Sequence, residues 1–249
     1  MKKKPNNIIA INAIALCAAL TLAANADPAA EPSIPVGSLE AYPTFVRQGT
    51  KPNLTWDITY PSEVKDYVDV DEDEVTPKTQ LVAEIRILGT GVTKGEGKKI
   101  KLVPAKAEVK SGGSSYNQIF HGTNDDVVPG GVVWTKVVQA GETMRFGGQF
   151  DDNGYMGHHY TSGDGSTNIR TLVRGDNPPK FNMVPGAPTL ESFLAPYLDS
   201  SGLIKIGPMD VICFMELTHT KSQSESNGYD FQDMVLLVTF KEVPEDNGQ

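Results

Sequence analysis

The sequence predicts an all-β fold, a sandwich or barrel with long loops and one short helical insertion. Segments 81–88 and 144–150 alternate apolar and polar residues, with the period of a strand that has one buried face. Segments 211–217 and 234–240 are nearly continuous apolar runs of strand length, typical of central strands that are buried on both faces. Turn-forming residues separate these runs, as in all-β proteins.

The alternating segments predict which residues enter the core. One face of the first strand carries Leu81, Ala83, Ile85 and Ile87, and one face of the second carries Met144, Phe146, Gly148 and Phe150. A further apolar alternation begins at Ile100 and shifts by one position after Pro104. Because proline cannot donate a hydrogen bond to a neighbouring strand, we expect a bulge or a strand break at Pro104.

Two strand pairs are predicted to be hairpins. Residues 132–138 precede 144–150, and Ala140-Gly141-Glu142 between them supplies a turn. Residues 211–217 and 234–240 flank a loop rich in Ser, Asn and Gly, so we expect a central hairpin with a long solvated connection.

One helix is predicted near residues 189–200. Thr189 follows Pro188 and can cap the first amides, whereas Pro196 should kink or end the first turns. Apolar residues recur at helical spacing and would form one stripe: Leu190, Phe193, Leu194, Tyr197 and Leu198.

The first 26 residues have the pattern of a signal peptide. Lysines at positions 2–4 precede an apolar run from Ile8 to Ala24, and the small-residue triplet Ala24-Asn25-Ala26 follows. This order predicts cleavage after Ala26 and export to the periplasm, the cell surface or the exterior. The expected organisation is a signal peptide (1–26), a flexible leader (27–33), a single β-sandwich domain (34–244) and a disordered tail (245–249).

The charge balance excludes several classes of partner. The chain has a formal net charge of −9, and removing the three lysines of the signal peptide makes the mature chain more acidic still. Such a surface repels phosphate backbones and anionic lipids, so we expect no nucleic-acid partner. No second apolar run approaches the length of a transmembrane segment.

Cysteine usage predicts a fold without disulfides. Cys17 leaves with the signal peptide, and Cys213 is then the one remaining thiol. Because Cys213 lies within the apolar run 211–217, we expect it to be a small buried hydrophobe and not a nucleophile.

A short segment resembles a known family of domains. Val46-Arg47-Gln48-Gly49, followed by Leu54-Thr55-Trp56-Asp57-Ile58, is similar to the first strands of immunoglobulin-like domains in bacterial surface proteins. The resemblance implies an immunoglobulin-like β-sandwich in which Leu54, Trp56 and Ile58 face inward. The mature chain as a whole also resembles exported bacterial proteins.

The densest charge cluster is residues 69–74. Asp69, Asp71 and Asp73 follow the spacing that opens an EF-hand calcium loop. Glu74 stands where that loop needs glycine, and Gln80 stands where it needs a bidentate Glu. We therefore expect a solvated acidic loop and predict no cofactor, with an irregular calcium site at the three aspartates as the alternative.

The loop 151–168 is the main candidate for ligand binding. It carries Asp151, Asp152, His158, His159 and Asp164. Adjacent histidines on an extended chain point to opposite sides, so His158 and His159 can share one metal ion only in a tight turn. His121 and His219 are further imidazoles that the fold could bring near. No Gly-x-Ser-x-Gly motif is present, so a serine hydrolase of that type is not predicted.

Trp134 is a candidate sugar-binding residue, because an exposed aromatic ring on a sheet can stack on a sugar. The sequence as a whole favours an exported, non-enzymatic structural or binding module with a protein or glycan partner. Two alternatives remain: a carbohydrate-binding β-sandwich, and a metal- or carboxylate-dependent hydrolase that uses the loop 151–168.

Overall fold

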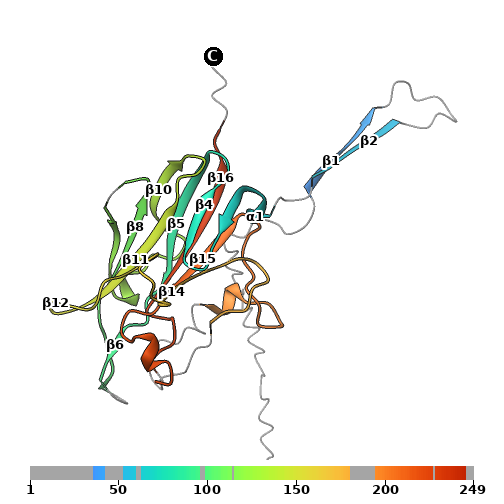
Figure 1. The fold of residues 1–249 in the computed structure, drawn as a ribbon. Helices are drawn as coiled ribbons and strands as arrows, with labels where there is room; N and C mark the ends of the chain where they lie inside the picture. Colours follow the sequence, from blue (N-terminus) through green and yellow to red (C-terminus); the bar gives the residue numbers. More distant parts are fainter. Residues whose placement is uncertain are drawn as a thin grey trace, which may run out of the picture.

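Two antiparallel β-sheets make up most of the structure, a computed structural model that describes residues 36–42, 53–59, 63–95, 99–113, 115–179, 194–226 and 228–244 (Figure 1). The five-stranded sheet has the order β10-β5-β16-β15-β14. Its strands are β5 (Leu81–Gly89), β10 (Val132–Val138), β14 (Ile169–Leu172), β15 (Asp210–Met215) and β16 (Met234–Glu242).

The seven-stranded sheet follows the order β3-β4-β11-β8-β9, and β12 and β13 also pair with β11. Its strands are β3 (Val68–Val70), β4 (Glu74–Pro77), β8 (Ala105–Ser111), β9 (Asn117–Gly122), β11 (Met144–Asp152), β12 (Tyr155–Met156) and β13 (Tyr160–Thr161). The two sheets meet at one side, where the Thr171 N–H of β14 donates to the Glu72 carbonyl beside β4 (2.8 Å).

The remaining elements are short. Two small sheets are formed by β1 (Val36–Tyr42) with β2 (Asn53–Thr59), and by β6 (Thr93–Lys94) with β7 (Lys101–Leu102). Among the described residues, the helical elements with complete bounds are α1 (Val64–Tyr67) and the 3-10 turns η2 (Asn124–Asp126), η3 (Ala195–Tyr197) and η4 (Lys221–Gln223). No helix among the described residues is long and apolar enough to cross a membrane.

The main hydrophobic core lies between the two large sheets. Inward-facing residues of both contribute to one cluster, among them Ile85, Val238, Ala107 and Phe146. A second cluster covers the other face of the five-stranded sheet, where Ile212, Phe214 and Leu237 pack against the segment 194–206. The middle of this sheet is therefore buried on both faces.

The central hairpin is confirmed. Strands β15 and β16 pair antiparallel, with Val211 opposite Val238 and Cys213 opposite Leu236. Every residue of β15 is buried. Cys213 is fully buried as expected, and burial raises the pKa of its thiol well above the ordinary value.

The alternation of β5 is also confirmed, because every second residue from Leu81 to Gly89 is buried. The break at Pro104 is confirmed too. Strand β7 ends at Leu102, and β8 begins at Ala105. The apolar residues of β8 stand at odd positions, whereas Ile100 and Leu102 stand at even ones. The inward face of β8 therefore belongs to the core despite the shift.

The predicted hairpin between 132–138 and 144–150 is wrong. Strand β10 pairs with β5 in one sheet, whereas β11 pairs with β8 and β4 in the other. The connecting turn crosses from sheet to sheet, and its Gly141 N–H donates to the Pro77 carbonyl (2.8 Å). A short turn permits a hairpin, but in the fold β10 pairs at the edge beside β5, whereas β11 lies between β4 and β8.

The predicted helix near 189–200 is described only from Leu194 onward, and Leu194 itself is α-helical. Residues 189–193 lie outside the described residues, and η3 follows directly after Leu194, with Pro196 in its first turn. Leu194, Tyr197 and Leu198 nevertheless pack into the second core cluster, as the stripe predicts. The structure also has the short α-helix α1, which the sequence pattern does not predict.

The segment that resembles immunoglobulin-like domains is a strand as expected. It forms β2, whose residues pair with β1 in a separate two-stranded sheet and with neither large sheet. Its side chains, and the predicted signal peptide, leader and tail, lie outside the described residues.

Candidate functional site

The histidines of the loop 151–168 contact different partners. His159 Nε2 lies 2.7 Å from Glu108 Oε2 on β8, and the two rings of His158 and Tyr160 meet edge to face at 4.5 Å. His121 Nε2 lies 3.1 Å from Asp151 Oδ2. The loop therefore does not bring the imidazoles onto one point, and the described part of the chain holds no group of three or more His, Cys, Asp or Glu side chains arranged for a metal ion.

The other acids of that loop have local roles. Asp152 Oδ2 lies 2.6 Å from Lys94 Nζ at the exposed end of β11. Asp164 accepts hydrogen bonds from the N–H groups of Thr161 (3.0 Å) and Ser166 (2.6 Å) and so closes a turn. Burial raises the pKa of Asp164, but these hydrogen bonds lower it more, so that this pKa lies below its ordinary value.

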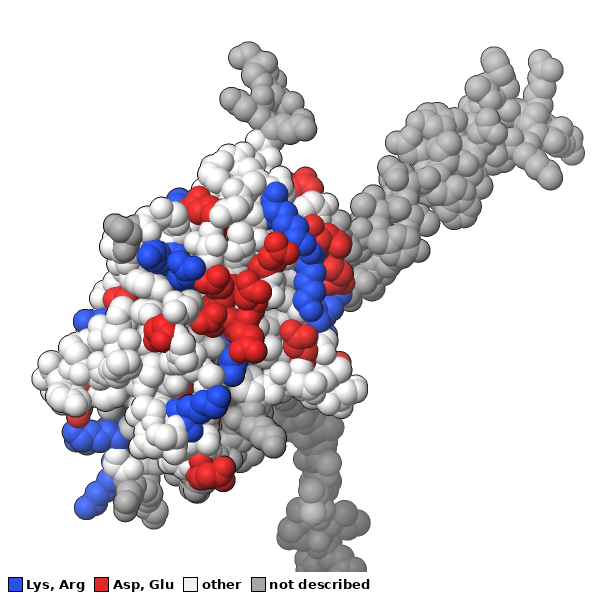
Figure 2. All heavy atoms as spheres, viewed as in Figure 1, with Lys and Arg blue, Asp and Glu red and all other residues white. Residues whose placement is uncertain are grey.

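The three aspartates of the acidic segment lie around the β3–β4 turn. Asp69 pairs with Lys78 (3.0 Å), and Asp73 Oδ2 accepts the Gly163 N–H (2.8 Å). The Asp71 carbonyl accepts a hydrogen bond from the Thr171 hydroxyl. Calcium at this turn stays a prediction. Figure 2 shows acidic side chains gathered on this face, near the place where Figure 1 has β4, β11 and β14 together.

Trp134 is partly buried on β10. It lies opposite Ile85 on β5 and packs against the main core. A sugar ligand at Trp134 stays a prediction.

A pocket of about 410 Å³ opens beside β14, on the face of the five-stranded sheet that turns away from the main core. Strand β14 and the loops after β14 and β15 form its walls. The residues that line it are Thr167, Arg170, Leu172, Asn177, Pro179, Lys221, Ser224, Tyr229 and Phe231.

The pocket combines cationic, hydroxyl and apolar groups. Arg170 Nη1 lies 2.6 Å from Glu72 Oε2, so its charge is partly neutralised. Lys221 belongs to η4 and pairs with no carboxylate among the described residues. Tyr229 and Phe231 stack edge to face, with ring centroids 5.3 Å apart, and they give the pocket an apolar wall.

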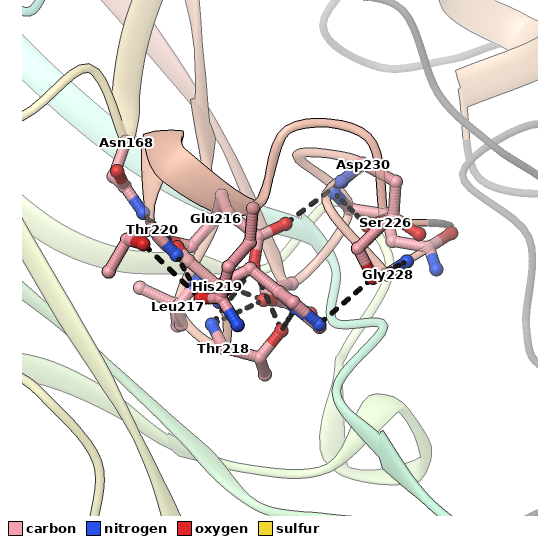
Figure 3. Close-up of polar contacts among 12 residues, drawn as sticks. Asn168, Glu216, Leu217, Thr218, His219, Thr220, Ser226, Gly228 and Asp230 are labelled. Carbon is pink, nitrogen blue, oxygen red and sulfur yellow. Dashed lines mark hydrogen bonds and ion pairs between the residues drawn. The ribbon is translucent and has the colours of Figure 1, made fainter.

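A fully buried carboxylate, Glu216, is hydrogen-bonded to the backbone of Asp230, which lies between the two wall residues in the chain (Figure 3). Glu216 Oε1 accepts hydrogen bonds from the N–H groups of Thr218 (2.9 Å) and His219 (2.8 Å) and from the Thr218 hydroxyl (2.8 Å). Glu216 Oε2 accepts the Asp230 N–H (2.9 Å). One buried side chain therefore ties the beginning of the loop 216–233 to its end.

Two more carboxyl groups are buried beside Glu216. Burial and the charge of Glu216 raise the pKa of Asp230 to about 8. Burial and the charges of Glu216 and Asp230 raise the pKa of Asp233 well above its ordinary value, although Asp233 Oδ2 also accepts the Leu217 N–H (2.7 Å). Near neutral pH Asp230 is therefore largely protonated.

The ring of His219 lies between two hydroxyl groups (Figure 3). Its Nδ1 is 2.7 Å from Thr218 Oγ1, and its Nε2 is 3.3 Å from Ser226 Oγ. The Asn168 amide donates to the carbonyls of Glu216 (2.8 Å) and His219 (2.6 Å), which holds the backbone in place.

The sequence reasoning missed this cluster, although a signal was present. Glu216 interrupts the apolar run 211–217, and Asp233 directly precedes the run 234–240. A carboxylate inside a strand that excludes water must be hydrogen-bonded or protonated. Such a position is therefore a better candidate than an acid in an exposed charge run.

Comparisons with known proteins found no match for this chain. No protein-family model matches the chain, no curated protein is significantly similar to it, and no solved structure matches its fold.

Proposed function

We propose that the protein is an exported β-sandwich binding module that holds a small anionic molecule with an apolar body in the pocket beside β14. The immunoglobulin-like form of the fold is part of this proposal and rests on the resemblance of residues 46–58. Export rests on the basic, apolar and small-residue order of residues 1–26.

The observation that carries the proposal is the chemistry of the pocket walls. Arg170 and Lys221 line the pocket, and no carboxylate is among its described lining residues. This contrasts with a chain whose net charge is −9. Leu172, Tyr229 and Phe231 supply an apolar surface, and Thr167 with Ser224 supplies hydroxyl groups. Such a combination favours a ligand with one anionic end and a ring or alkyl body.

The size of the pocket agrees with a small ligand. Its volume of about 410 Å³ falls in the range of small-molecule sites, roughly 300–1,000 Å³. The wall is also held in place before a ligand arrives, because Glu216 fixes the Asp230 N–H between Tyr229 and Phe231. A preformed wall reduces the entropy lost on binding.

The proposal is tested with benzoate and its neutral analogue benzamide, titrated into the mature protein by calorimetry and NMR. We expect benzoate to bind with a Kd of about 1 mM, as is usual for a fragment of this size, and benzamide to bind more weakly. Lys221→Gln should weaken benzoate binding about fivefold, because it removes a charge-assisted contact.

The matched control is Lys110→Gln. It makes the same change of charge on β8, on the outer face of the other sheet. Lys110→Gln should leave the Kd for benzoate unchanged. Equal binding of benzoate and benzamide, or equal effects of the two substitutions, would contradict the proposal.

A further inference from the structure

We infer that Ser226 is a nucleophile activated by His219, and that the loop 216–233 is an acyl-transfer site for carboxylic esters. This inference goes beyond the proposed binding function and does not depend on which anion the pocket holds. It rests on a chain of hydrogen bonds from Glu216 through Thr218 and His219 to Ser226 (Figure 3).

The direction of each hydrogen bond follows from the chemistry of its ends. A carboxylate only accepts, so the Thr218 hydroxyl donates its proton to Glu216 Oε1 (2.8 Å). The Thr218 oxygen must then accept from His219 Nδ1, 2.7 Å away, which places the ring proton on Nδ1. His219 Nε2 is therefore left with a lone pair that faces Ser226 Oγ.

The Ser226 hydroxyl can donate to His219 in the same direction along the chain of hydrogen bonds. Its oxygen accepts the Gly228 N–H (3.3 Å), so its own proton can point to His219 Nε2 at 3.3 Å. This distance is longer than in a working complex, as is common before a substrate binds. A hydroxyl that donates to a neutral imidazole is the arrangement that base-assisted nucleophiles share.

The burial of the members increases along the chain of hydrogen bonds. Ser226 is partly exposed, the His219 side chain is 26% exposed, and the Glu216 side chain is 0% exposed. The nucleophile can therefore reach a substrate, while the carboxylate that stabilises a protonated imidazole is shielded from water. A shielded carboxylate interacts with an imidazolium more strongly than a solvated one does.

Gly228 makes room for the imidazole. A Cβ atom at this position would lie 2.4 Å from His219 Cε1, closer than any real contact. Any other residue at position 228 would move the ring away from Ser226 or shift the loop. The absence of a side chain there fits a ring that must lie beside the Ser226 hydroxyl.

The chemistry balances without a further reactant except water. Ser226 Oγ attacks the ester carbonyl carbon, and its proton passes to His219 Nε2. The bond from that carbon to the alcohol oxygen breaks, and the alcohol leaves with the proton from His219. Water then attacks the acyl carbon of the acyl-Ser226 ester, and its proton passes to the same nitrogen. The bond from that carbon to Ser226 Oγ breaks, Ser226 Oγ takes the proton back from His219, and a carboxylic acid is released.

The surroundings indicate the substrate class. The loop that carries Ser226 also contributes Lys221, Tyr229 and Phe231 to the pocket. An apolar or aromatic group of the ester fits against the two rings, and the carboxylate formed by hydrolysis suits Lys221. We therefore expect esters of small apolar acids and not phosphate esters or peptides.

The test is covalent labelling of the folded mature protein with a fluorophosphonate probe, which forms an Oγ–P bond and releases fluoride. Intact-mass analysis should show one adduct, and peptide mapping should place it on Ser226. Ser226→Ala and His219→Gln should lower the labelling rate at least about 100-fold, the usual contribution of general base assistance. Ser222→Ala, in the same loop, should label as the wild type does.

Substitutions of Thr218 test whether the hydrogen bonds from Glu216 to His219 form a relay or only hold the loop together. Thr218 is a positioning residue that acts through His219. Thr218→Val should slow labelling and the hydrolysis of 4-nitrophenyl acetate about fivefold to tenfold, the effect of one lost hydrogen bond. Thr218→Ser should restore both rates and the pH profile of labelling, since it keeps the hydroxyl. Circular dichroism verifies that each variant is folded.

Labelling at residues other than Ser226, or equal labelling of the wild type and Ser226→Ala, would overturn the inference. Wild-type rates of labelling and hydrolysis in Thr218→Val would overturn the relay through Thr218. If Ser226 is labelled but benzoate does not bind, the acyl-transfer site stands and the proposed anion pocket fails.

Discussion

Two loops of this protein carry the same kinds of residue and use them differently. The loop 151–168 and the loop 216–233 both contain histidine, acids and hydroxyl groups. In the first, His159 pairs with Glu108 on the outer face of a sheet, and the imidazole is 39% exposed. In the second, His219 lies against Glu216, which water does not reach. Residue type alone therefore does not make a site, and burial decides which carboxylate organises its surroundings.

The reason lies in the strands that each loop follows. The loop 151–168 leaves the far end of β11, beyond the core, and returns along the same sheet through β12 and β13. The loop 216–233 joins β15 to β16, the most deeply buried pair. Its two ends must pass through the core boundary, so their backbone N–H groups need buried acceptors, which Glu216 and Asp233 provide.

The largest expected difference between the loops concerns stability. Glu216→Ala leaves the N–H groups of His219 and Asp230 without their buried acceptor and takes one of two acceptors from the Thr218 N–H, and we expect it to cost about 4 kcal/mol of unfolding free energy. Glu108→Ala removes a partly exposed ion pair and should cost about 0.5 kcal/mol. Urea unfolding of both variants measures this. Equal losses would contradict the contrast between the two loops.

The second expected effect is a dependence of stability on pH that originates in the second loop. Asp230 has an ordinary pKa of 3.8 and a pKa of about 8 in the fold, so the folded chain holds this proton more tightly than the unfolded chain does. The unfolding free energy should therefore fall as the pH rises from about 4 to about 8. The raised pKa of Asp233 acts in the same direction.

Asp230→Asn tests this dependence. The amide oxygen can still accept the Gln232 N–H, and no proton is lost at high pH. We expect the variant to lose this dependence, so that its unfolding free energy exceeds that of the wild type at pH 8 and differs little from it at pH 4. The control is Asp125→Asn, an exposed acid in η2, which should leave the slope unchanged. An unaltered slope in Asp230→Asn would remove Asp230 as its source.

The smallest expected effect is in the first loop. His121→Ala breaks the pair with Asp151, in which the imidazole is 38% exposed, and should change the unfolding free energy by about 0.5 kcal/mol or less. A loss above about 2 kcal/mol in urea unfolding would mean that this loop is organised as tightly as the second.

The strands of highest apolar content could be predicted from the sequence. The buried face of β5 and the pairing of β15 with β16 followed from periodicity and run length, because both are set by neighbours along the chain. The partner of β10 could not be predicted in this way. The turn at residues 139–143 fits either a hairpin or a crossing between sheets. The choice depends on whether β5, which is distant in the sequence, has a free edge with which β10 can pair.

The candidate site, too, could be predicted from the sequence only in part. Periodicity and composition by themselves determined that the chain is all-β, that its carboxyl-terminal strands exclude water, and that Cys213 lies inside. Only the tertiary structure decided that Glu216 is the acceptor at the centre of a loop, and that Thr218, His219 and Ser226 stand in line with it. The reason is physical: alternation records which face of a strand avoids water, whereas hydrogen bonds depend on distances of about 3 Å that arise only when separate segments pack together.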